Sequence, residues 1–150
     1  IVSPIADSLY PYMVKNKDFK LVKRILLIAT PLILAGATLL FIFADQICEF
    51  VFGPGYAEAG MIVRCLLPAI MVIIPSYIIC FPVLVPLGLS SKANLSNFVG
   101  LCVQLVALVA LVVTGNFNVY TMCLATSAAE VSVFLYRMLV VLRFKKAARQ

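Results

Sequence analysis

Three long stretches without a charged residue constrain the fold of this chain more than any other feature. They run over Ile25–Ala44, Cys65–Ser91 and Ala93–Ala129. A transmembrane helix needs about 20 apolar residues, so each stretch is long enough to cross a bilayer. The third is too long for one crossing, and the polar turn signal Thr114–Asn118 divides it in two. The sequence therefore predicts an all-α, polytopic membrane protein with four transmembrane helices.

The four predicted helices are about Ile25–Phe43, Cys65–Leu87, Leu95–Val113 and Val119–Leu142. Hydrophobic residues make up 64% of the chain and charged residues 12%. Soluble domains are roughly half apolar and about a quarter charged, so the composition also favours a membrane protein. Histidine is absent and the cysteines are dispersed, which removes both metal-ligand spacing and the usual base of a nucleophilic triad. We expect no metal, no cofactor and no enzymatic activity.

Basic residues gather on one side of the predicted membrane. They precede the first helix, separate the second from the third, and follow the fourth: Lys15, Lys17, Lys20, Lys23, Arg24; Lys92; Arg143, Lys145, Lys146, Arg149. The first loop instead contains Asp45, Glu49 and Glu58. Because cytoplasmic loops hold the excess of Lys and Arg, we expect both termini in the cytoplasm. The net charge of +6 then reflects orientation and contact with membrane lipids, and nucleic acid is not an expected partner.

The ends of the predicted helices suggest further local structure. Ile1–Met13 is neither a signal peptide nor a complete crossing, so we expect it to end an earlier element. The chain would then be the C-terminal part of a longer protein, with natural cleavage as the alternative. Ile47, Phe50 and Val51 form one apolar face, which predicts a short interfacial helix after the first crossing. Ala35-Gly36-Ala37 offers a small face for close helix packing.

The second predicted helix is rich in proline. Pro68, Pro75, Pro82 and Pro86 fall on roughly one face of it. Each interior proline removes a backbone hydrogen bond and bends the helix. Two interpretations remain open: a permanently bent packing helix, or a hinge at Pro68, Pro75 and Pro82 that moves between two states.

Several motifs along the chain occur together in one known family. They are Leu9-Tyr10-Pro11-Tyr12, Ala44-Asp45-Gln46-Ile47, Phe52-Gly53-Pro54-Gly55-Tyr56-Ala57-Glu58-Ala59, Arg64-Cys65-Leu66-Leu67-Pro68, Gly88, Ser91-Lys92-Ala93-Asn94 and Leu135-Tyr136-Arg137. With these motifs the chain resembles the C-terminal part of a polysaccharide (O-antigen type) flippase. That family belongs to the multidrug/oligosaccharidyl-lipid/polysaccharide transporter superfamily. The Phe-Gly-x-x-Tyr-x-x-Ala pattern is the most specific of the motifs.

The resemblance implies a fold and a function. The four helices would form part of a six-helix transporter lobe, and the N-terminal lobe of the same chain would be missing. The complete protein would flip undecaprenyl-pyrophosphate-linked oligosaccharide across a bacterial inner membrane by alternating access. Its partners would be the lipid-linked oligosaccharide, membrane lipids and the polysaccharide polymerase machinery. A multidrug extruder of the same superfamily and a non-transporting four-helix scaffold are the alternatives.

Glu130 and Arg137 are the most unusual residues of the fourth predicted helix. An ionised side chain in the middle of a membrane costs at least about 2.5 kcal/mol, so such residues face a protein interior or a wet cavity. Together with Cys123 and Ser127 they fall on approximately one helical face. Glu130 is either a cavity carboxylate that couples transport to an ion gradient or a structural ion pair. Arg137 either snorkels to the interface or faces the cavity and binds a pyrophosphate.

Three further polar residues complete the cavity candidates. On the third helix, Asn97 and Gln104 share one stripe with Asn94. Their amides either bind sugar hydroxyls or join neighbouring helices. Arg64, at the start of the second helix, is either an interfacial anchor or a cavity residue. The cysteines are expected to be small buried hydrophobes, with one disulfide near the outer side as the alternative.

Overall fold

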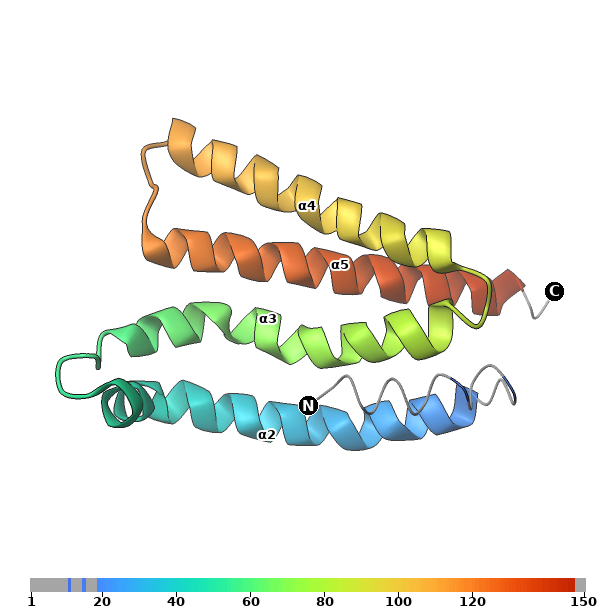
Figure 1. Ribbon diagram of the computed structural model, residues 1–150, viewed down its shortest axis with the longest axis horizontal. Helices are drawn as coiled ribbons and strands as arrows, with labels where there is room; N and C mark the ends of the chain where they lie inside the picture. The colour runs from blue at the N-terminus through green and yellow to red at the C-terminus, as the bar shows by residue number, and fades with distance from the viewer. Residues whose placement is uncertain (1–10, 12–14, 16–18, 148–150) are drawn as a thin grey trace.

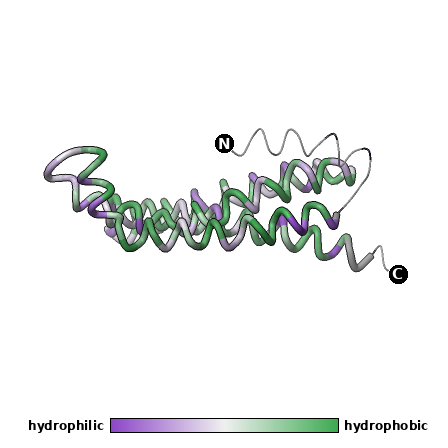
Figure 2. The backbone as a smooth tube through the Cα atoms, turned by 90° about the horizontal axis from the view of Figure 1, so that it is seen from below, coloured by the Kyte–Doolittle hydropathy of each residue, from purple (hydrophilic) through white to green (hydrophobic). Residues whose placement is uncertain are grey.

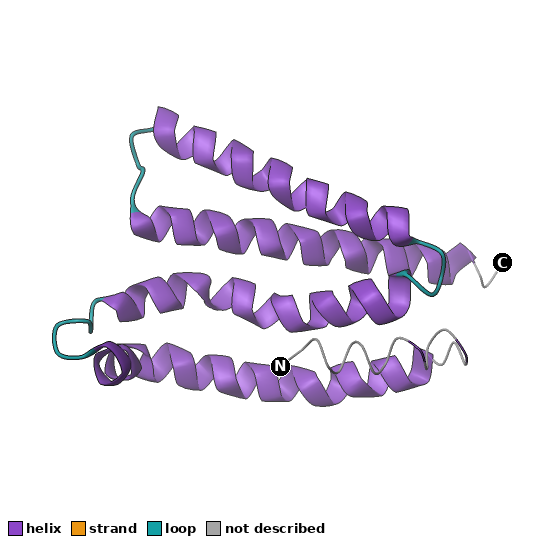
Figure 3. Cartoon of the chain, viewed as in Figure 1, coloured by secondary structure: helices purple, strands orange, loops and turns teal. Residues whose placement is uncertain are grey.

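The computed structural model describes Pro11, Lys15 and residues 19–147, with side chains described for Pro11, Lys15 and residues 20–144. The elements are α2 (Phe19–Phe52), α3 (Ala59–Ile79), the π-helical segment η1 (Cys80–Leu84), α4 (Ser90–Val113) and α5 (Val119–Ala147) (Figure 1). Within this described part the chain consists only of helices and the loops that join them (Figure 3). Apart from Pro11, the segment Ile1–Met13 lies outside the described residues.

The structure confirms the prediction of four helices long and apolar enough to cross a membrane. They cover Lys20–Phe52, Ala59–Leu84, Ser90–Val113 and Val119–Phe144. The first three begin earlier than the sequence predicts, because polar and small residues before each apolar stretch also take part in the backbone hydrogen bonds of the helix. A multi-pass membrane protein follows from their length and composition.

The helices lie side by side in the order α2, α3, α5, α4 (Figure 1). α3 packs against both α2 and α5, and α4 packs against α5. The α2–α3 and α4–α5 loops lie at one end, and the α3–α4 loop lies at the other end with the end of α5 (Figure 1). In the perpendicular view the helices overlap in a thin, mostly hydrophobic layer (Figure 2). The described helices therefore form an open layer and not a closed bundle.

The outer helices of this layer expose large apolar side chains. Leu32 on α2 is 74% exposed, and Val113 at the end of α4 is 80% exposed. Buried residues concentrate on α3, η1 and α5, which occupy the middle of the layer. Apolar patches of this extent are unfavourable in water but match lipid or a protein partner. The exposure pattern therefore agrees with a membrane environment.

Two glycines set the closest helix contacts. A Cβ on Gly60 of α3 would overlap the side chain of Asp45 and lie 2.8 Å from its backbone nitrogen. A Cβ on Gly100 of α4 would lie 2.5 Å from Cγ2 of Val133 on α5. The expectation of close packing at Ala35-Gly36-Ala37 is wrong for the glycine, since a Cβ on Gly36 would meet no atom within 4 Å.

The end of α2 differs from the prediction of a separate interfacial helix. Ile47, Phe50 and Val51 belong to α2, which continues without interruption to Phe52. Figure 1 draws these last turns nearly end-on, so they bend away from the axis of the rest of α2. The continuous run of residues without Gly or Pro between Ala37 and Phe52 explains why the helix does not stop at the predicted end. Gly53, with φ of 99°, then ends it.

The proline-rich helix is divided by its backbone geometry. α3 continues through Pro68 and Pro75, but it ends at Ile79 instead of the predicted Leu87. Pro82 lies in the π-helical segment η1. Because proline has no N–H, Pro82 cannot complete the α-helical ladder, and the wider π turn accommodates the loss. Whether these prolines act as hinges stays a prediction.

Candidate functional site

A groove of about 700 Å³ opens between α3 and α4, and α5 forms its floor. It contains both charged residues and both amide residues that lie within the predicted spans, Glu130, Arg137, Asn97 and Gln104. The residues that line it are Ile73, Ser76, Tyr77, Cys80, Phe81, Asn94, Asn97, Gly100, Leu101, Gln104, Thr126, Ala129, Glu130, Val133 and Arg137. The structure thus brings together four of the five predicted cavity candidates, namely Glu130, Arg137, Asn97 and Gln104.

Among the side chains that line this groove, Arg137 forms the most hydrogen bonds. Its Nε donates to Ser96 Oγ at 2.8 Å, and its Nη2 donates to Asn97 Oδ1 at 2.8 Å. Nη1 donates to the hydroxyl of Ser76 at 2.8 Å and to its carbonyl oxygen at 3.2 Å. A guanidinium has five N–H donors, so one N–H on Nη2 keeps no acceptor among the described residues. These bonds tie α5 to both α3 and α4.

Arg137 is buried between α3, α4 and α5. The residue is only 8% exposed, which contradicts the snorkelling interpretation. Its acceptors are neutral, and no carboxylate among the described residues pairs with it. An arginine stays protonated in proteins, so a positive charge is fixed at this end of the groove. Arg137 instead donates hydrogen bonds to residues of α3 and α4, because Ser76 and Ser96 lie at the same depth as Arg137.

Gln104 contributes an unsatisfied acceptor to the groove. The hydroxyl of Thr126 donates its single hydrogen to the carbonyl oxygen of Met122 at 3.1 Å. It can therefore only accept from Gln104, whose Nε2 lies 3.5 Å away, and this fixes the orientation of the amide. Oε1 of Gln104 remains buried without a donor, and it is the one such atom in the described part of the chain. A buried acceptor of this kind favours a ligand or partner that brings an N–H or O–H.

The remaining amides and Glu130 extend this polar surface. Asn94, Asn97 and Gln104 recur three and seven residues apart, and all three line the groove as one stripe of α4. Asn97 uses Oδ1 for Arg137, which leaves its Nδ2 as a donor. Glu130 is partly exposed in the groove and forms no ion pair or hydrogen bond with any described residue. It lies seven residues before Arg137, about 10 Å along the helix axis.

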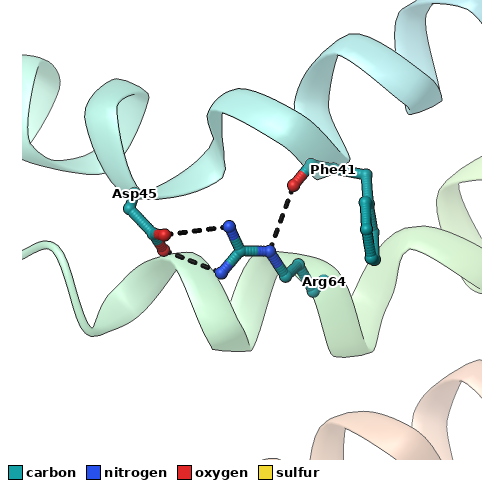
Figure 4. Close-up of polar contacts among 3 residues, drawn as sticks. All are labelled: Phe41, Asp45 and Arg64. Carbon is teal, nitrogen blue, oxygen red and sulfur yellow. Dashed lines mark hydrogen bonds and ion pairs between the residues drawn. The ribbon is translucent and has the colours of Figure 1, made fainter.

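Arg64 lies outside the groove, near the α2–α3 loop. Its Nη1 and Nη2 donate to the two carboxylate oxygens of Asp45 at 2.8 and 2.9 Å, and Nε donates to the carbonyl oxygen of Phe41 at 3.1 Å (Figure 4). The guanidinium carbon also lies 5.7 Å from the centre of the Phe41 ring. This bidentate pair joins α2 to α3. The geometry places Arg64 in a helix–helix tie and not in the groove.

Sequence reasoning missed several of these partners. Ser76 and Ser96 are small polar residues inside apolar helices. A polar residue at such a position could have been predicted to face other polar groups and not lipid. Asp45 and Arg64 lie at similar distances along the sequence from the short α2–α3 loop. The antiparallel helices α2 and α3 therefore place them at the same depth. Ser127 does not share the groove with Glu130: its hydroxyl donates to the carbonyl oxygen of Cys65 at 2.7 Å, three residues before Pro68.

The cysteines and metal-binding side chains form no further site. All five cysteines are free, which excludes the disulfide alternative in this structure. Within the described ranges no three His, Cys, Asp or Glu side chains come together as metal ligands. Comparisons with protein-family models, with curated proteins and with solved structures find no significant match to this chain.

Proposed function

We propose that this chain is the C-terminal transmembrane region of a flippase for undecaprenyl-pyrophosphate-linked oligosaccharide. It would supply four helices of a six-helix lobe in a bacterial inner membrane, with both termini in the cytoplasm. The groove would form one wall of a central cavity, and the N-terminal lobe would supply the opposite wall. Two lobes would then alternate access to the two sides of the membrane, without enzymatic chemistry.

One observation carries this proposal: a groove of about 700 Å³ holds a fixed cation, an unpaired carboxylate and a buried acceptor without a donor. Polar and ionised groups are costly in lipid, and they gather where a substrate path runs through a membrane protein. The sugar headgroup of a lipid-linked oligosaccharide brings many hydroxyl donors and acceptors. Its lipid tail would stay in the bilayer beside the apolar outer helices.

The geometry suggests separate roles for the groove residues. Because Arg137 already donates four hydrogen bonds, its main contribution would be a positive potential toward pyrophosphate, with one free N–H on Nη2. Oε1 of Gln104 and Nδ2 of Asn97 would accept from and donate to sugar hydroxyls. Glu130 would couple the cycle to an ion or proton gradient.

The open layer favours a transporter part over a self-contained four-helix scaffold. A scaffold would be expected to enclose its polar residues and to pair Glu130 within its own helices. Here Glu130 has no described partner, and the groove lacks an opposite wall within the described residues. A multidrug extruder of the same superfamily is less well supported, since cationic drugs would meet the charge of Arg137 in the groove.

The test is transport by Glu130→Gln and Gln104→Leu variants of the intact protein. We expect surface polysaccharide to fall strongly in a strain that depends on the protein, while both variants keep the wild-type thermal unfolding midpoint. Both side chains are partly exposed, so neither change leaves a cavity in a packed core. The readout is the amount of surface polysaccharide at equal protein levels in the membrane.

The matched control is Ser132→Ala, two residues from Glu130 on the same helix. The Ser132 hydroxyl only donates back to the carbonyl oxygen of Ala128 at 2.8 Å and does not line the groove. Wild-type polysaccharide in this control is expected. Wild-type polysaccharide in both groove variants would remove the groove from the transport mechanism.

A further inference from the structure

A second cavity lies at the opposite side of α3, near the start of α2 and the end of α5. It has a volume of about 170 Å³ and lies between α2, the α3–η1 junction and α5. Its walls are Val22, Lys23, Leu26, Ile79, Val83, Met138, Val141 and Leu142. All of these side chains are apolar except Lys23. We call this cavity the Lys23 crevice.

The crevice has a cationic mouth and an apolar interior. Lys23 lies close to the start of α2, and Leu142 lies close to the end of α5, at the same end of the layer (Figure 1). Leu26 lies about one turn deeper along α2, and Met138 lies about one turn deeper along α5. Ile79 and Val83 are only 3% and 4% exposed, so they form a firm floor. A chain that enters beside Lys23 would meet only apolar side chains.

Nothing described at the mouth neutralises Lys23. Its side chain is exposed, and the described residues give it no ion pair. The nearest described carboxylate on the same helix is Asp45, about 33 Å farther along α2. Arg143, which is also exposed, follows the lining residue Leu142 in the sequence. As far as the described residues define it, the mouth of the crevice is therefore positive.

We infer that the Lys23 crevice binds an anionic phospholipid. One acyl chain would lie against Leu26, Met138 and the η1 floor, and the phosphate would meet the ammonium of Lys23. Charge complementarity selects this occupant, because a basic pocket between transmembrane helices matches an anionic headgroup and an apolar crevice matches its acyl chain. A bound lipid would fill the junction of three helices that direct side-chain packing leaves open. This inference does not depend on the transport proposal.

The experiment measures lipid binding to the purified intact protein by native mass spectrometry. Phosphatidylglycerol and phosphatidylcholine with identical acyl chains are titrated separately. We expect tighter binding of phosphatidylglycerol, and Lys23→Gln should weaken it about fivefold, since a basic residue near the membrane surface contributes about 1 kcal/mol. Met138→Trp, which fills the crevice, should weaken the binding of both lipids.

The matched control is Arg24→Gln, which removes an exposed charge next to Lys23 but outside the crevice. It should leave the phosphatidylglycerol affinity within experimental error of the wild type. Equal losses in Lys23→Gln and Arg24→Gln would mean general surface attraction and would overturn the inference. Equal affinity of the wild type for both lipids would also overturn it. Circular dichroism and thermal unfolding verify that each variant is folded.

Discussion

Arg64 and Arg137 show how two guanidinium groups are stabilised differently in apolar surroundings. Arg64 has a carboxylate partner, and the side chains of Arg64 and Asp45 remain 24% and 45% exposed. Arg137 is buried and relies on two serines and an asparagine. A compensated pair carries no net charge into the membrane, whereas Arg137 leaves a positive charge that a ligand or partner can use. Position in the layer thus separates a structural arginine from a candidate functional one.

The Asp45–Arg64 pair predicts a particular pattern of stability. Asp45→Asn and Arg64→Gln should each lower the thermal unfolding midpoint, because each leaves one charge without its partner in an apolar environment. The double variant should lose less than the sum of the two single losses. Thermal unfolding in one detergent measures all three. Glu49→Gln, at an exposed site of the same helix, is the control, and strictly additive losses would contradict the coupling.

At the scale of the helices, close packing depends on which glycines face a neighbour. Gly60 lies against Asp45 of α2, and Gly100 lies against Val133 of α5. Both are buried, and each marks a crossing between neighbouring helices. Gly36 lies in the middle of the length of α2 and is exposed, and a Cβ there would meet no atom within 4 Å. Small residues promote helix packing in membranes only where a second backbone is near.

The two kinds of glycine should respond oppositely to alanine. Gly60→Ala should destabilise the protein by about 1–3 kcal/mol, because the new methyl group forces α2 and α3 apart. Gly36→Ala, the matched control, should be neutral or stabilising by up to about 1 kcal/mol, since alanine favours the helix. Denaturation in mixed detergent measures both. A Gly60→Ala variant as stable as the wild type would show that the helices do not approach this closely.

At the scale of the whole molecule, the four helices form a layer with two exposed faces. The groove lies on α5 between α3 and α4, and the Lys23 crevice lies between α2, α3–η1 and α5. Both sites use α5, which is one of the two inner helices. One polar wall together with apolar outer helices agrees with a multi-pass membrane protein.

The alternating loops give a topology that labelling can test. With all five native cysteines replaced, we expect Ser91→Cys to react with a membrane-impermeant maleimide only after the cells are opened. Asn116→Cys should react in intact cells. The physical reason is the excess of Lys and Arg at the end that holds Ser91. Labelling of Ser91→Cys in intact cells, with protection of Asn116→Cys, would reverse the proposed orientation.

Much of the architecture could be predicted because lipid imposes a simple length rule. The uncharged runs predicted four helices, and the Thr114–Asn118 break appears as the loop between α4 and α5. Helical spacing predicted that Asn97 and Gln104 share a face, and both line the groove. Hydropathy did not predict that α2 continues to Phe52, and it did not predict the π-helical segment at Pro82. Both depend on where the backbone hydrogen bonds of a helix continue or stop, which hydropathy does not report.

The sequence by itself determined the membrane environment, the number of helices long enough to span a membrane and the residues that lipid disfavours. These follow from side-chain hydropathy and from the rise per residue of a helix. Only the tertiary structure decided which partner each polar residue has. Arg64 pairs with Asp45, Arg137 binds Ser76, Ser96 and Asn97, and Glu130 stays unpaired among the described residues. The physical reason is that a hydrogen bond depends on a distance of about 3 Å between different helices. That distance is set by helix order and close packing, which no local pattern in the chain contains.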